Sequence, residues 1–152
     1  MRSYDQAFDR LAPWGIAILR VVVGLTFFLH GWQKLFDNGI GGVGQFFGMV
    51  GVPAPAVAAF VITFIELVGG AALIVGVFTR WAALLLTLDM LGAIVFVHHR
   101  NGFFVGGQQP GVELVLLLGA AALCLALAGP GQLSLDGVLG LGRSRIAAPS
   151  RA

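Results

Sequence analysis

The stretch PAVAAFVITFIELVGGAALIVGVF, at residues 55–78, decides the fold class of this chain. A helix needs about 20 apolar residues to cross the hydrocarbon core of a bilayer, and about 17–25 are tolerated. The stretch has this length and contains a single charged residue, Glu66. It lacks the strict alternation of apolar and polar residues that a membrane β-strand requires. We therefore predict a transmembrane helix.

Three further apolar stretches flank it, at residues 14–36, 81–98 and 112–129. Turn-forming residues separate the four, and a Gly-Pro-Gly sequence at 129–131 ends the last one. The sequence therefore predicts an all-α fold, a four-helix transmembrane bundle at residues 13–137. Residues 1–12 and 138–152 are expected to be tails.

The composition supports lipid as the solvent. Of the 152 residues, 58% are hydrophobic and 11% are charged, with a mean hydropathy of +0.93. A soluble domain carries about 25% charged residues, and a small protein has too much surface to cover with fewer. The single cysteine, Cys124, excludes an internal disulfide or a dithiol redox pair.

The distribution of basic residues predicts the orientation. Cytoplasmic loops of membrane proteins carry an excess of Lys and Arg. In a four-helix topology, Lys34 and Arg100 fall near one side. Six arginines fall on the other side: Arg2, Arg10, Arg80, Arg143, Arg145 and Arg151. We therefore expect both termini to be cytoplasmic in a multi-pass protein of the bacterial plasma membrane. We expect the excess Arg to report topology, with no nucleic acid as a partner.

Segments outside the four stretches also carry signals. The outer segments 44–52 and 102–105 are rich in Phe, so we expect them to lie in the membrane interface or to fold back over the bundle. An apolar piece at 133–141 has Ser134 as a plausible N-cap and predicts a short helix. The residues after Gly142 are predicted to be disordered.

Ionisable groups inside the spans indicate where function lies, because each costs about 2.5–3.5 kcal/mol on insertion scales. At about 1.5 Å per residue, Arg20, Glu66 and Asp89 lie roughly 10, 18 and 14 Å from the cytoplasmic edge. We predict that Arg20 pairs with Glu66 or Asp89 in a structural layer. The ligand-binding or proton-relay candidates are His30, Lys34, Glu66, His98 and Glu113.

An outer layer is expected above the Arg20 layer, in which Lys34 pairs with Glu113 and both His30 and His98 lie nearby. The spacing of potential ligands is too wide to indicate a metal site. On an ideal helix, Gly24 and Gly31 share a face with Arg20 and Lys34, which would let a neighbouring helix approach closely.

The sequence resembles the DoxX family of small bacterial membrane proteins. The matching pieces are LRVVVGLTFFLHGWQKLF at 19–36, GVPAP at 51–55, ELVGGAALIVGVFTR at 66–80, HHRNGFF at 98–104 and GPGQLSLD at 129–136. The resemblance implies a four-helix membrane protein. Some members of that family are linked to membrane oxidoreductase assemblies, such as thiosulfate:quinone oxidoreductase, and to oxidative or thiol stress responses. The resemblance identifies no catalytic residue.

Three functions are therefore open. The first is a subunit of a membrane oxidoreductase system, rather than an enzyme alone, which binds quinone or docks redox partners through the outer polar cluster. The second is a non-catalytic scaffold or accessory subunit of a membrane complex. The third is a small-solute carrier, which with four helices would have to be a homo-oligomer.

Overall fold

The structure, a computed structural model, describes residues 2–106 and 110–141, and the side chains from Phe8 onward in those ranges. All regular structure in them is helical. The elements are α1 (Arg2–Trp32), the π-helical turn η1 (Gln33–Asp37), α2 (Gly39–Met49), α3 (Pro55–Val75), α4 (Thr79–Ala93), the π-helical turn η2 (Ile94–His98), α5 (Glu113–Ala128) and α6 (Leu135–Leu139).

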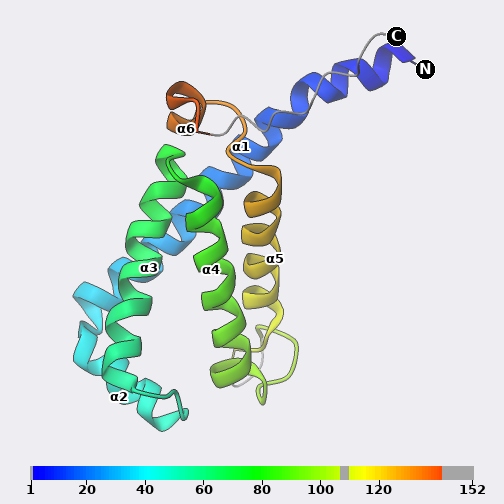
Figure 1. The fold of residues 1–152 in the computed structure, drawn as a ribbon. Coiled ribbons are helices and arrows are strands. Elements are labelled where there is room, and N and C mark those ends of the chain that lie inside the picture. The colour runs from blue at the N-terminus through cyan, green and yellow to red at the C-terminus, as the bar shows by residue number, and fades with distance from the viewer. Residues whose placement is uncertain (1, 107–109, 142–152) are drawn as a thin grey trace, which may run out of the picture.

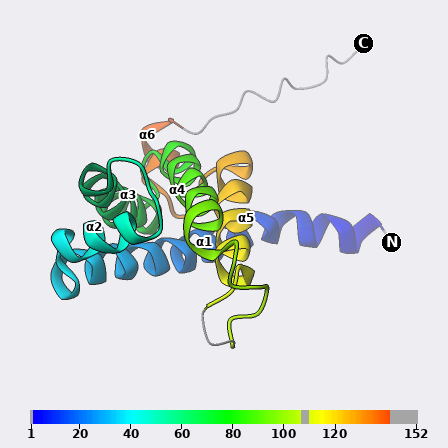
Figure 2. The same cartoon turned by 90° about the horizontal axis from the view of Figure 1, so that it is seen from below.

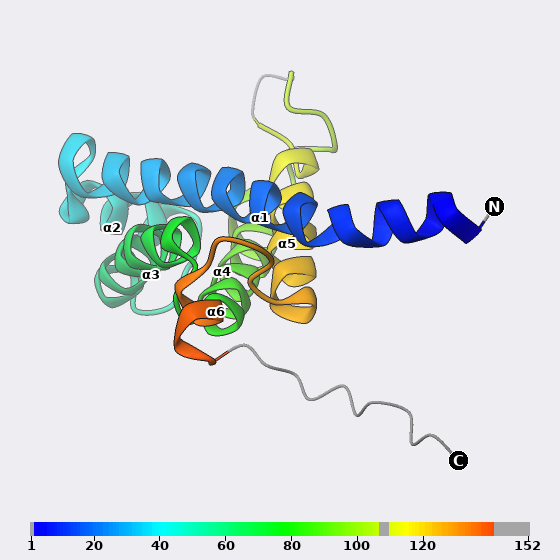
Figure 3. The same cartoon turned by 90° about the horizontal axis from the view of Figure 1, so that it is seen from above.

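The four long helices pack in a ring. Helix α1 lies against α3 and α5, and α4 lies against the same two helices from the other side. Helix α1 runs obliquely across the bundle, and its first turns extend away from the other helices (Figure 1). Figure 3 shows from above how these first turns of α1 extend beyond the bundle. Figure 2 shows α2 beside α3, at the end of the bundle opposite to them. The helices α2 and α6 thus lie at opposite ends of the bundle.

Three helical segments are long and apolar enough to cross a membrane: Phe8–Asp37, Pro55–Val75 and Thr79–His98. Helix α5 is apolar but shorter, at 16 residues. Large apolar side chains such as Ile18, Leu25 and Leu117 are exposed on the outer surface, as a lipid-facing surface requires. The predicted all-helical class is confirmed, with three candidate spans by length.

The contact between α1 and α3 is the most extensive in the molecule, and glycine makes it possible. A Cβ atom on Gly31 would lie 2.5 Å from the backbone nitrogen of Leu67, and one on Gly24 would lie 2.8 Å from the carbonyl oxygen of Gly70. The two backbones therefore touch directly. The close approach expected at Gly24 and Gly31 is confirmed, and it fixes the register of these antiparallel helices.

The apolar core occupies the middle of the ring. Phe27 of α1, Leu73 of α3, Leu86 of α4 and Leu125 of α5 are all fully buried in one cluster. A smaller cluster joins α2 to the start of α3 through Val43, Phe47 and Ala59. The core therefore separates a polar region near α6 from a second one toward α2.

Several boundaries differ from those expected. Helix α1 begins at Arg2 and continues through Pro13, so residues 2–12 are helical. The glycine-rich connection after Asn38 forms a helix, α2, because Val43 and Phe47 bury one face against α3. The predicted tail helix is confirmed, and the Ser134 Oγ accepts a bond of 3.1 Å from the Gly137 amide. The disorder predicted after Gly142, and Arg143, Arg145 and Arg151, lie outside the described residues.

Candidate functional site

A buried ion pair joins α1 to α3. The Lys34 amine, in η1, donates to the Glu66 carboxylate at the centre of α3. The Glu66 side chain is 3% exposed and that of Lys34 is 23% exposed. The pair forms because Gly31 touches Leu67, which brings η1, the next turn of the chain, beside Glu66. It is the one ion pair among the described side chains.

A second carboxyl group lies at the same level. Asp89 of α4 is 8% exposed. Its carboxyl group interacts with the carboxyl group of Glu66 and with the Lys34 amine. Its Oδ2 has no hydrogen-bond partner among the described residues. Two carboxyl groups and one amine therefore meet inside the bundle; we call Lys34, Glu66 and Asp89 the charge cluster.

A pocket of about 390 Å³ adjoins the charge cluster on the side of α2. It is lined by Lys34, Asn38, Gly42, Val43, Phe46 and Phe47. The Phe46 and Phe47 ring centroids are 6.2 Å apart. Lys34 therefore belongs both to the wall of an aromatic pocket and to the charge cluster. We call this space the α2 pocket.

The backbone at Lys34 is itself unusual, because η1 is a π-helical turn. Such turns are rare and occur often at functional sites. The second one, η2, ends at His98. Both turns follow apolar helices at the end of the bundle that carries the charge cluster. The spacing of residues in the sequence did not predict either turn.

Arg20 does not pair with Glu66 or Asp89, so that prediction is wrong. Its guanidinium donates to the backbone carbonyl oxygens of Leu73 at 3.0 Å and Leu133 at 2.8 Å. The α1–α3 register places Arg20 beside the end of α3, where carbonyl groups lack helical partners. The buried Arg20 therefore anchors the segment before α6 to the bundle.

Asp136, for which no role was predicted, completes this second polar region. Its two carboxylate oxygens each accept a bond of 2.8 Å, from the amides of Phe78 and Thr79 at the start of α4. The Asp136 amide in turn donates to the Gly76 carbonyl oxygen at 2.8 Å. A carboxylate two residues after the Ser134 N-cap was the available signal for this role.

The predicted outer layer is not assembled. Glu113 is exposed and accepts a bond of 3.2 Å from the Val105 amide, whereas Lys34 pairs with Glu66. The predicted Lys34–Glu113 pair is therefore wrong. The His98 Nδ1 lies 2.8 Å from the Pro110 carbonyl oxygen. His98 and Glu113 thus hold the loop before α5.

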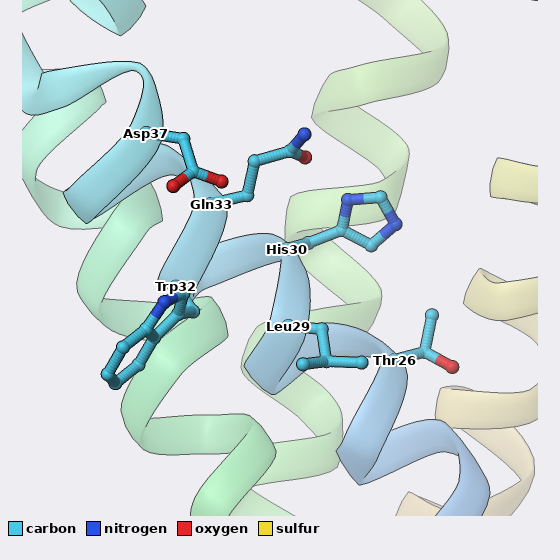
Figure 4. A pocket seen from close by; sticks show the side chains of 6 residues that line it. All are labelled: Thr26, Leu29, His30, Trp32, Gln33 and Asp37. Carbon is cyan, nitrogen blue, oxygen red and sulfur yellow. The ribbon is translucent and has the colours of Figure 1, made fainter.

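His30 forms no ion pair with Glu113 among the described side chains. It lines a shallow depression with Thr26, Leu29, Trp32, Gln33 and Asp37, all from α1 and η1 (Figure 4). The consecutive segments α1 and η1 supply every residue of its wall. The described residues contain no group of three or more His, Cys, Asp or Glu side chains suited to a metal ion.

The DoxX family model matches residues 15–99, which is more than half of the sequence. The chain belongs to the DoxX family. All three members of the charge cluster lie within the matched residues, whereas Glu113 and α6 lie outside them. The arrangement of α1, α3 and α4 around that cluster is therefore the DoxX part of the fold.

Individual relatives agree with this assignment. A Bacillus subtilis protein named "Putative oxidoreductase CatD" is 38% identical over 80% of this chain and 84% of its own. The Escherichia coli "Inner membrane protein YphA" is 32% identical over 90% of this chain and 96% of its own. The Mycobacterium tuberculosis "Uncharacterized membrane protein Rv3486" is 34% identical over 88% of this chain and 86% of its own. No solved structure matches.

These similarities and the three apolar helices make this DoxX protein a multi-pass protein of the bacterial inner membrane. Its long helices therefore face lipid, and the charge cluster lies in the membrane interior. There, unlike in water, an unpaired ionised group has little solvent to stabilise it.

Proposed function

We propose that this DoxX protein is a subunit of a membrane oxidoreductase system and that the α2 pocket binds a quinone head group. The observation that carries the proposal is the position of Lys34. Its amine is the one cation in the pocket wall, beside the aromatic rings of Phe46 and Phe47. A ligand with carbonyl oxygens on a flat ring matches this combination, because an ammonium donates to carbonyl oxygens and aromatic rings stack on one another.

The remaining support comes from size and similarity. A pocket of about 390 Å³ falls in the range of about 300–1,000 Å³ for small-molecule sites. The relative from Bacillus subtilis carries "oxidoreductase" in its name. The chain itself contributes one cysteine, so electrons must come from partner proteins. The ligand-binding role of His30, His98 and Glu113 stays a prediction.

Purification in a mild detergent, followed by organic extraction, tests the proposal. The wild-type protein should carry quinone and bind a short-chain benzoquinone or naphthoquinone. The Phe46→Ala variant should bind about 2–10-fold more weakly, because it loses one ring contact worth about 0.5–1.5 kcal/mol. Met49→Ala is the matched control, since Met49 lies on the same helix and is 79% exposed. Absence of bound quinone, together with equal affinities for the two variants, would contradict the proposal.

The same proposal includes four membrane spans with both termini in the cytoplasm. Helix α5 has 16 residues and is about 24 Å long, so a small local thinning of the bilayer would let it cross. The α3–α4 turn, α6 and the N-terminal end of α1 lie at one end of the bundle (Figure 1). Arg10 and Arg80 belong to that end, which supports a cytoplasmic location.

Cysteine accessibility tests this topology. In a Cys124→Ser background, a membrane-impermeant maleimide should label Asn101→Cys in intact spheroplasts. It should label Gln132→Cys only after permeabilisation. Labelling of both positions in intact spheroplasts would show that α5 does not cross the bilayer.

A scaffold role is the second candidate function. The loop after η2 projects from the bundle (Figure 2), and it exposes Phe103 by 51% and Phe104 by 73%. Exposed aromatic residues are typical of protein contacts. If Phe104→Ala releases a co-purifying membrane protein while quinone binding is unchanged, the loop is a docking surface. Retention of every partner would argue against a scaffold role for this loop.

A further inference from the structure

The charge cluster is unbalanced when all of its groups are ionised. Two carboxylates, Glu66 and Asp89, face one ammonium group, Lys34. The sum is one negative charge in the membrane interior, where an isolated ionised group costs several kcal/mol. Lys34 already donates to Glu66, so the surplus charge falls on Asp89.

Among the described side chains, no cation forms an ion pair with Asp89. Helix α2 has no ionisable side chain. On α5 the ionisable groups are Cys124, which is exposed, and Glu113, which bonds the Val105 amide. On η2, His98 is engaged by the Pro110 carbonyl oxygen. Arg20 bonds backbone carbonyl oxygens at the other end of the core.

An unpartnered atom marks where the missing group belongs. The Asp89 Oδ2 is buried and lacks a hydrogen-bond partner, while the carboxyl group beside it belongs to Glu66. Two carboxylates at close range cannot both remain ionised without a cation between them. A proton on one of them restores neutrality and supplies the missing hydrogen bond between the two carboxyl groups.

We propose that Glu66 and Asp89 share one exchangeable proton, which makes the charge cluster a proton-binding site inside the bundle. The proton then belongs to the two interacting carboxyl groups together rather than to either alone. Lys34 is 23% exposed and lines the α2 pocket, which gives the proton a route to the cluster. The site needs no ligand in the pocket and can be tested separately from quinone binding.

Amide variants test the site while keeping the charges balanced. Asp89→Asn leaves Glu66 to neutralise Lys34, and Glu66→Gln leaves Asp89 to do so. Each variant should therefore fold, as gel filtration and circular dichroism will verify, and each should bind one proton fewer than the wild-type protein. Lys34→Met should have the opposite effect, because two buried carboxyl groups without a cation require two protons.

The readout is ¹³C NMR of carboxyl-labelled Asp and Glu in lipid nanodiscs, measured from mildly acidic to alkaline pH. The chain has two glutamates, Glu66 and Glu113, so Glu113→Gln assigns the Glu signals. We expect the Glu66 and Asp89 signals to shift in one common step, and that of Glu66 to stay in the carboxylate position throughout in Asp89→Asn. The proposal is overturned if both carboxyl groups are ionised at neutral pH. A shift of both signals on adding sodium at fixed pH would also overturn it, since the site would then hold a metal cation.

Discussion

The direct backbone contact between α1 and α3 is the feature on which the charge cluster depends, and Gly70→Ala perturbs it by one methyl group. A Cβ atom at position 70 would lie 2.4 Å from the backbone nitrogen of Phe28 and 2.7 Å from the carbonyl oxygen of Gly24. Favourable contacts between carbon atoms begin at about 3.5 Å. The helices must therefore separate by about 1 Å, because neither backbone can rotate away as a side chain can.

The expected cost follows from these distances. Overpacking in a core costs about 1–3 kcal/mol, and contact with backbone atoms places this site at the upper end. The higher helix propensity of alanine offsets part of this cost, by about 0.5–1 kcal/mol relative to glycine. We therefore expect Gly70→Ala to lower the free energy of unfolding by about 2 kcal/mol. The separation should also lengthen the Lys34–Glu66 pair.

Gly92→Ala is the matched control. Gly92 lies inside α4, and no heavy atom lies within 4 Å of its Cβ position. The variant should be as stable as the wild-type protein or more stable by up to about 1 kcal/mol. Reversible unfolding in mixed micelles with increasing SDS, followed by circular dichroism, measures both. Equal stability of the Gly70→Ala and Gly92→Ala variants would refute the close contact.

Two further substitutions test the polar region near α6. Arg20→Met should lower the free energy of unfolding by about 3 kcal/mol, because the carbonyl oxygens of Leu73 and Leu133 lose a buried charged donor. Thermal unfolding measures this loss of stability. A loss below about 1 kcal/mol would contradict the contact. Asp136→Ala should leave two backbone amides at the start of α4 unpaired and cost about 2 kcal/mol. Limited proteolysis should then cut after α5 faster than in the exposed control variant Gln132→Ala, and unchanged cleavage would argue against this role.

The helical class and the capped tail helix could be predicted because they depend on neighbouring residues. The apolar run at residues 55–78 indicates by its composition alone that the surrounding solvent is lipid. The N-cap of the tail helix needs only a hydrogen bond from the Gly137 amide to the Ser134 hydroxyl, three residues apart. The Gly24–Gly31 face could also be identified, since helical periodicity alone defines it.

The partners of the charged residues could not be predicted, because they depend on the tilt of α1. A depth calculated at about 1.5 Å per residue assumes a helix along the membrane normal, and it separated Lys34 from Glu66. In the structure α1 runs obliquely across the bundle (Figure 1), and Lys34 meets Glu66. The same register carries Arg20 to the end of α3 and away from the carboxylates. The α2 pocket was missed because the glycine-rich segment gave no sign of a helix.

The charge cluster depends on the Lys34–Glu66 contact, which can be measured directly because Lys34 is the only lysine in the sequence. Protein labelled with ¹⁵N-lysine and ¹³C-glutamate and reconstituted in lipid gives a single ammonium signal in solid-state NMR. We expect strong dipolar dephasing of that signal by a glutamate carboxyl carbon, which persists in Glu113→Gln and disappears in Glu66→Gln. An ammonium signal without dephasing in the wild-type protein would contradict the contact.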